Sequence, residues 1–121
     1  MSGTGLKRVQ AFFFANSLGH EPVRSWLAEL DRPDRKLIGR ALMTVEFGWP
    51  VGMPISRPMG GGLHELRVTL GNQRAARVFF YIDRAERLIL LHAMLKTTRA
   101  TPERDLELAR RRMREHQRSI G

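Results

Sequence analysis

The sequence predicts one α+β domain in which helices pack on a mainly antiparallel sheet. Its 121 residues, 42% of them hydrophobic, suit a single core, and no repeat or long linker divides residues 1–121. Two stretches before residue 50 have apolar side chains at helical spacing, and three stretches after residue 62 have strand patterns. The predicted element order is β-α-α-β-β-β followed by a C-terminal helix.

The N-terminal half predicts a strand and a two-helix hairpin. Lys7–Ala15 is a short apolar segment, which we interpret as the first strand. A helix is predicted over Glu21–Leu30, with Pro22 at its first position, and a second helix is predicted to open at Pro33. Each has an apolar stripe: Val23, Trp26, Leu27 and Leu30, then Ile38, Ala41, Leu42, Val45 and Trp49. Because few residues join them, we expect an antiparallel hairpin.

A long loop and three strands are predicted next. Gly48–Gly62 holds five glycines and three prolines, so we predict a loop without regular structure. Leu63–Leu70 and Ala75–Ile82 alternate in side-chain character, as half-buried strands do. Leu88–Leu95 is apolar on both faces, which is typical of a central strand.

The last helix is predicted to have Thr101 as its cap and Pro102 at its first position. Its apolar stripe is narrow and consists of Leu106, Ala109 and Met113. Since the two-helix hairpin covers one sheet face, this helix must lie at an edge or partly over the other. We therefore expect part of that second face, which carries Arg67 and Arg77, to stay open.

The composition favours a polyanionic partner and excludes several kinds of site. Twenty-one basic residues oppose twelve acidic ones, for a net charge of +9, which favours contact with nucleic acid; a general bias toward arginine is the alternative. The absence of cysteine excludes disulfides, thiol nucleophiles and cysteine metal sites. The sequence has no metal-ligand spacing and no cofactor fingerprint, so we expect neither a bound metal nor a cofactor. No apolar run approaches the roughly 18 residues of a membrane span, so we expect a soluble cytoplasmic protein.

Arg67 and Arg77 are the first candidate catalytic residues. They lie on consecutive predicted strands joined by a short turn, which makes them cross-strand neighbours with β-carbons about 5 Å apart. Like charges that face each other on a sheet are unfavourable, and an anion held between them would offset that cost. The alternative is that one arginine pairs with Glu65 and both point into water.

Lys96 and His92 are the second pair of candidates. Lys96 is one of only three lysines, and nearby arginines would lower its pKa into the range of a general acid or base; an ordinary solvated lysine is the alternative. His92 lies inside an apolar strand, where a hydrogen-bonded core histidine is the alternative to a catalytic one.

One aromatic residue and several arginines are candidate RNA contacts. Tyr81 shares the face of Arg77 and would stack a nucleobase, unless the last helix packs on it as we expect for Phe79. The arginine-rich end of that helix would bind phosphates or form an ordinary solvated face. The predicted RNA-binding residues are Tyr81, Arg74, Arg110, Arg111 and Arg114.

Five stretches occur in order along the chain: FGWPVGMP, LHELRV, RAARVFF, LLHAMLKTTRATP and DLELARRRM. Over roughly His20 to Gln117 they resemble the phage-derived HigB-like toxins of the RelE/ParE superfamily. The resemblance implies a RelE/ParE-like fold and a metal-independent endoribonuclease that cleaves mRNA on the ribosome. Partners it implies are the ribosome, mRNA and a cognate helix-turn-helix antitoxin.

The resemblance also implies site residues. The family's strand arginines match Arg67 in LHELR and Arg77 in RAARV, its basic residue after the last strand matches Lys96, and a histidine of some members lies near His92. A related branch poisons DNA gyrase, so the alternatives are a gyrase-poisoning toxin that cuts nothing and a non-catalytic basic nucleic-acid-binding prophage protein. The sequence predicts no oligomeric state.

Overall fold

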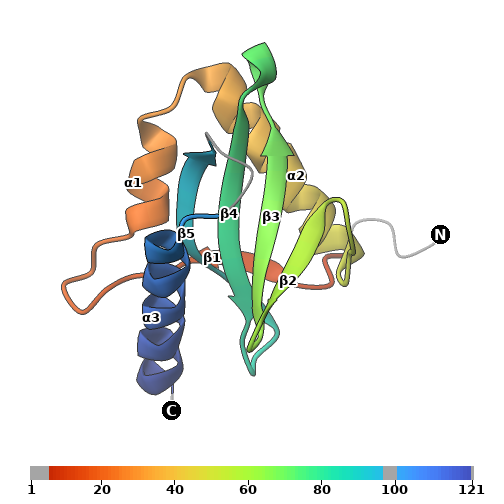
Figure 1. Cartoon of the computed structure of the whole chain (residues 1–121). Coiled ribbons are helices and arrows are strands. Elements are labelled where there is room, and N and C mark those ends of the chain that lie inside the picture. The colour runs from red at the N-terminus through yellow and green to blue at the C-terminus, as the bar shows by residue number, and fades with distance from the viewer. Residues whose placement is uncertain (1–5, 97–100, 121) are drawn as a thin grey trace.

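The computed structural model describes residues 6–96 and 101–120, which form three α-helices and one five-stranded sheet (Figure 1). The α+β class is therefore confirmed. The helices are α1 (Pro22–Ala28), α2 (Arg32–Gly48) and α3 (Glu103–Ser119). The strands are β1 (Gln10–Phe13), β2 (Ser56–Gly60), β3 (Leu63–Thr69), β4 (Ala75–Ile82) and β5 (Arg87–Lys96). Within these residues, none of the helices has the length and apolar character needed to cross a membrane.

The sheet has the order β1-β5-β4-β3-β2 and is mainly antiparallel, as predicted. Only β1 runs parallel to its neighbour β5. The two helices and three strands between them along the chain provide the long connection that parallel pairing needs. The strand β5 lies between β1 and β4, which explains why its sequence is apolar on both faces.

The prediction of an unstructured loop over Gly48–Gly62 was wrong, because this segment contains β2. The strand β2 pairs with β3 at the sheet edge, where Pro58 removes no hydrogen bond from an interior ladder. Three glycines, 60–62, all have positive φ angles and turn the chain back into β3. Because proline and glycine are typical of loops, their presence in β2 prevents its prediction as an edge strand from the sequence.

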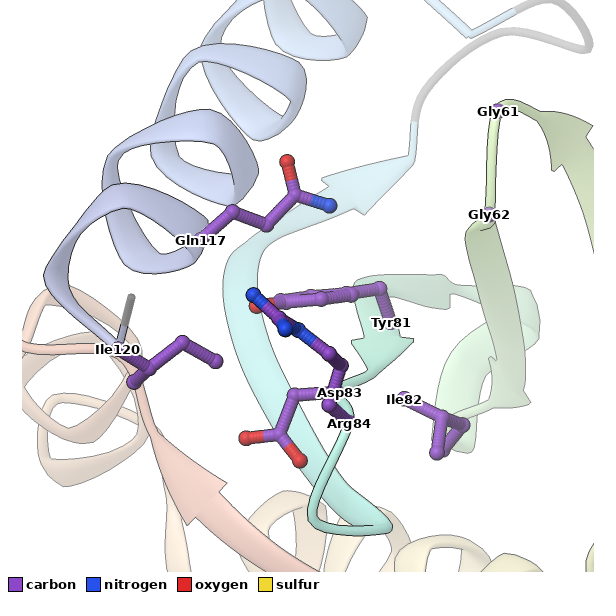
Figure 2. Close-up of a pocket in the computed structure, with 8 residues that line it drawn as sticks. All are labelled: Gly61, Gly62, Tyr81, Ile82, Asp83, Arg84, Gln117 and Ile120. Atoms are coloured by element: carbon purple, nitrogen blue, oxygen red, sulfur yellow. The ribbon is translucent and has the colours of Figure 1, made fainter.

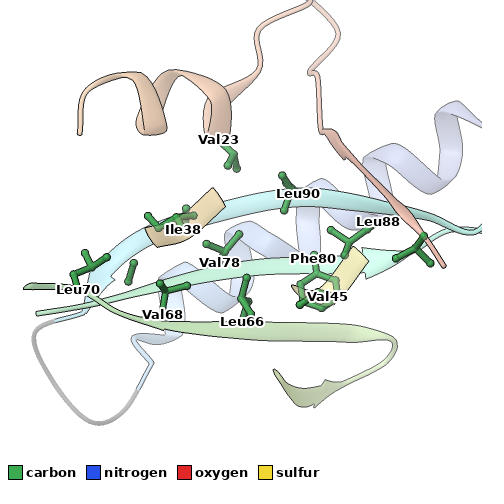
Figure 3. Close-up of a cluster of buried hydrophobic side chains, with 13 residues drawn as sticks. Val23, Ile38, Val45, Leu66, Val68, Leu70, Val78, Phe80, Leu88 and Leu90 are labelled. Atoms are coloured by element: carbon green, nitrogen blue, oxygen red, sulfur yellow. The ribbon is translucent and has the colours of Figure 1, made fainter. Parts of the chain in front are cut away.

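The larger core lies between the sheet and the pair α1 and α2. Figure 3 shows its side chains pointing from β3, β4 and β5 toward these helices, while α3 lies on the opposite side of the strands. Val23 of α1 and Ile38 and Val45 of α2 are buried there against Val78 and Leu90. The apolar stripes of the two helices are therefore used as predicted, although the helices splay apart instead of packing along each other (Figure 1).

The second core lies between the sheet and α3, which contacts β4 and β5. Ala109 and Met113 of α3 are buried against Phe79 and Tyr81. This confirms the expectation for Phe79 and shows that α3 covers one part of this face. The part of the face next to β2 and β3, beyond the start of α3, carries the candidate site.

Candidate functional site

Arg67 of β3 and Arg77 of β4 face each other directly across the sheet, as predicted. Their side chains differ in environment, however. Arg67 is exposed, whereas Arg77 is 4% exposed. The two guanidinium groups of this cross-strand pair therefore have different tasks: one faces solvent and the other is fixed inside the protein.

Glu65 fixes Arg77 in a buried ion pair. Nη1 of Arg77 donates to both carboxylate oxygens of Glu65, at 2.8 and 2.9 Å, and both side chains are almost completely buried. The alternative in which one arginine pairs with Glu65 thus holds for Arg77, but Arg77 does not point into water. Glu65 lies two residues before Arg67 on the same strand face.

Thr101 joins this pair to the region where α3 begins. Its hydroxyl donates to Glu65 at 2.7 Å and accepts from Arg77 Nη1 at 2.9 Å. The prediction that Thr101 caps the last helix was wrong, because Pro102 occupies the cap position and no side chain caps the helix there. The hydroxyl is used instead to hold the site together.

Lys96, the last residue of β5, completes the cluster. The register between β4 and β5 shifts by one residue between Phe79 and Phe80, so that Phe79 pairs with His92. From there to the end of β5, the even-numbered residues, including Lys96, share the sheet face of Arg77. The Nζ atom of Lys96 is buried and has no hydrogen-bond partner among the described residues. Burial first, and then repulsion by Arg77, lower the pKa of Lys96, although Glu65 opposes the shift.

Arg57 of β2 is the fourth cation of the cluster. It is exposed, lies opposite Glu65 in the sheet register, and its Nη2 is 4.0 Å from a Glu65 carboxylate oxygen. A small hollow of about 80 Å³ opens beside these groups; it is lined by Met53, Pro54, Arg57, Glu65, Arg67 and Arg77. Three of the four cations, Arg57, Arg67 and Arg77, line this hollow together with a single carboxylate, which makes it a place where an anion is stabilised.

His92 and Tyr81 are held under α3, away from solvent. His92 Nε2 lies 2.7 Å from Asp105 Oδ1, and its ring stacks on Phe79. Burial lowers the pKa of His92, although Asp105 opposes the shift. Tyr81 is 4% exposed and its hydroxyl is bonded to His116, so the prediction of a base-stacking surface at Tyr81 was wrong.

The predicted RNA-binding arginines divide into two groups. Arg74 makes two hydrogen bonds to Asp34 of α2, and Arg110 donates to the backbone carbonyls of Met59 and Gly60. Both therefore hold elements of the fold together. Arg111 and Arg114 of α3 are exposed, and they remain the arginines of this set that reach solvent freely.

A larger hollow of about 370 Å³ lies at the opposite end of β4 (Figure 2). Its walls come from the turn after β2, the end of β4 and the last turn of α3. Gln117 and Arg84 reach into it, together with Ile120. None of the predicted catalytic residues lines this hollow.

Three residues of the cluster were not predicted as site residues. Glu65 was expected only as the alternative partner of one arginine, and its alternation with Arg67 along the strand was the available signal for a place in the site. Arg57 lay inside the predicted loop, and Thr101 was assigned to a helix cap. Among the described residues no group of three or more histidine or acidic side chains is arranged to hold a metal ion. Residues 97–100, which belong to the LLHAMLKTTRATP stretch, lie outside the described part of the chain.

Comparison with known families gives one match. The model of the family described as Phage derived protein Gp49-like (DUF891) matches residues 25–114, about three quarters of the chain, including all four cations of the cluster. A search of the curated proteins finds no match.

Replacing Glu65 by glutamine should strongly destabilise the fold. The Glu65→Gln variant leaves the Arg77 guanidinium buried without its carboxylate, which typically costs about 3–5 kcal/mol. We expect this loss in the free energy of unfolding, measured by urea denaturation. Arg67→Gln, at the exposed position opposite Arg77, should stay within about 0.5 kcal/mol of the unchanged protein. A loss below about 1 kcal/mol for Glu65→Gln would show that the pair does not organise this region.

Acidification from pH 7.5 to 5.5 should lower the melting temperature. Burial lowers the pKa values of His64, His92 and His116 below 6.5, their value in the unfolded chain. Below pH 6.5 the unfolded chain therefore binds more protons than the folded chain, which favours unfolding. The stabilisation that comes from keeping these histidines neutral is complete above pH 6.5 and is lost as the pH falls toward their folded pKa values. Replacing all three histidines by glutamine should shrink the difference, whereas His20→Gln, at an exposed position, should not. An unchanged melting temperature at pH 5.5 would contradict the claim that the buried neutral histidines contribute to stability.

Proposed function

The chain belongs to the Gp49-like family of phage-derived proteins, a family associated with the toxins of toxin–antitoxin systems, and we propose that it is a toxin that cleaves mRNA on the ribosome. The observation that carries the proposal is the cation cluster at the hollow beside Glu65. Exposed Arg67 and Arg57 face solvent there and Arg77 lines the hollow beside them, while the buried Nζ of Lys96 lies within reach of the charge of Arg77. This arrangement suits a phosphodiester with its negative charge directed into the hollow.

The chemistry requires charge stabilisation and two proton transfers. The 2′-hydroxyl of the RNA attacks the adjacent phosphorus, the bond from phosphorus to the 5′-oxygen breaks, and a 2′,3′-cyclic phosphate and a 5′-hydroxyl result. Arg67 and Arg57 would stabilise the charge that develops on the phosphoryl oxygens. Lys96, whose pKa is lowered, would give its proton to the departing 5′-oxygen.

Among the described residues of the cluster, each candidate base for the proton of the 2′-hydroxyl is already engaged, so this proton would pass to water or to a group of the ribosome. Glu65 is occupied by Arg77 and Thr101, and His92 is bonded to Asp105. We therefore propose that free RNA is a poor substrate and that the ribosome completes the geometry of the reaction. The exposed arginines of α3, among them Arg111 and Arg114, would bind ribosomal RNA through phosphates, so that binding weakens steeply with salt.

A toxin of this type needs a neutralising partner. We propose a cognate helix-turn-helix antitoxin, and a short gene of that kind next to the gene of this protein would support the assignment. A gyrase-poisoning toxin is the competing proposal, because a shared fold does not determine the reaction. The cation cluster favours the nuclease, since a toxin that cuts nothing needs no cations placed to stabilise a developing phosphoryl charge.

Substitution at Arg67 or Lys96 should abolish toxicity. In a purified translation system with programmed ribosomes, Arg67→Ala and Lys96→Met should each slow mRNA cleavage by about 10²–10³-fold, because each removes one group that acts in the transition state. Arg24→Ala, which changes an exposed arginine on α1, is the control and should cleave normally. Melting temperatures show that the variants are folded.

Other outcomes point to other functions. If cells in which this protein is induced show DNA breaks while their mRNAs stay intact, the function is that of a gyrase-poisoning toxin and not of a nuclease. The absence of any effect on growth would favour the non-catalytic basic protein. Full cleavage activity in both Arg67→Ala and Lys96→Met would remove the proposed site.

A further inference from the structure

The outer side of α2 carries a stripe of exposed side chains that the proposed reaction does not use. Ile38 and Val45 point into the core, so the opposite side of this helix faces solvent. The spacing i, i+4, i+8, i+11 and i+15 places five residues in one line on that side, over about 22 Å at 1.5 Å per residue. These residues, all exposed, are Arg32, Lys36, Arg40, Met43 and Phe47.

The first half of this stripe is uniformly basic. The two acidic residues of α2 are both buried and both engaged: Asp34 accepts hydrogen bonds from Arg74, and Glu46 accepts from Lys7. No exposed acid therefore balances the cations along the helix, and Asp31, at the cap position, is the exposed acid next to it. A charged face of this kind attracts an anionic partner.

The second half of the stripe is apolar. Met43 is 55% exposed and Phe47 is 38% exposed, four residues apart on the same side of the helix. Neither belongs to the two buried clusters of the protein. A methionine and an aromatic residue side by side on a helix surface are typical anchors for a partner side chain.

We propose that the outer side of α2 is the docking site for an acidic amphipathic helix of a partner protein. Its carboxylates would pair with Arg32, Lys36 and Arg40, and its apolar side chains would cover Met43 and Phe47. RNA fits less well, because its phosphates would pair with the basic half of the stripe and leave the apolar side chain of Met43 without a matching surface. A second copy of the chain fits less well, because the basic halves of the two stripes would repel each other.

The position of the stripe separates it from the catalytic cluster. The helix α2 packs on the face of the sheet opposite to α3 (Figure 1), whereas Arg67 and Arg77 lie on the face of α3. The partner and RNA would therefore bind to different sides of the protein. Naming the partner as the antitoxin rests on the proposed function, but the docking surface itself does not.

Binding of a synthetic peptide to the full chain tests the proposal. The probe is a helical peptide of about 18 residues with glutamates along one half of a face and leucines along the other; its scrambled sequence is the control. Chemical-shift changes in an NMR titration should fall on α2, between Lys36 and Phe47. Met43→Gln with Phe47→Gln, and separately Lys36→Glu with Arg40→Glu, should each weaken binding by about tenfold or more. Arg111→Glu with Arg114→Glu on α3 is the charge-matched control and should bind within about twofold.

Four outcomes would overturn the proposal. The first two are equal binding of the scrambled peptide and shift changes centred on Arg67 and Arg77. The third concerns single-stranded RNA: Lys36→Glu with Arg40→Glu would lose RNA binding as severely as Arg111→Glu with Arg114→Glu. The fourth is self-association. A concentration-dependent dimer that Phe47→Gln abolishes would assign the surface to a second copy instead. Peptide binding and mRNA cleavage are both measured on the unchanged chain. Peptide binding without mRNA cleavage removes only the proposed function, and cleavage without peptide binding removes only this docking site.

Discussion

The buried ion pair between Glu65 and Arg77 is the interaction on which the candidate site depends. Removing two charges from water is costly, and the pair persists because its geometry is close and Thr101 supplies further hydrogen bonds. Through these contacts one carboxylate connects β3, β4 and the start of α3. Among the residues that line the hollow, Glu65 is the one carboxylate, and its charge offsets the repulsion among the arginines there. It also opposes the lowering of the pKa of Lys96.

The two faces of the sheet have separate tasks. One face is covered by α1 and α2 and contains the larger apolar core, which supplies most of the burial that stabilises the fold. The other face is covered by α3 mainly over β4 and β5, where Met113 and the contact between Asp105 and His92 hold the helix. Arg110 of α3 also bonds to the backbone of β2. This incomplete cover leaves space at the end of the sheet for charged side chains. The contact of His92 with Asp105 helps to position α3 next to the site.

Much of the fold could be predicted from local patterns, and less of the site could. Alternation along β3 and β4 predicts both strands and the pairing of Arg67 with Arg77. It does not predict which side chains α3 covers, because coverage depends on where the helix docks, and so Tyr81 was misassigned. The edge strand containing Arg57 was hidden by proline and glycine. Likewise, the register shift that brings Lys96 to the face of Arg77 has no signature in a strand that is apolar on both sides.

The central claim is that Arg57, Arg67 and Lys96 act together as one anion-binding site held in place by Glu65 and Arg77. The most direct test is an NMR titration of the folded chain with a single-stranded oligonucleotide that lacks 2′-hydroxyls and so is not cut. The side-chain nitrogen signals of Arg57, Arg67 and Lys96 should move together, with one midpoint. Signals that move only at Arg111 and Arg114 of α3, with Arg67 and Lys96 unchanged, would contradict the account.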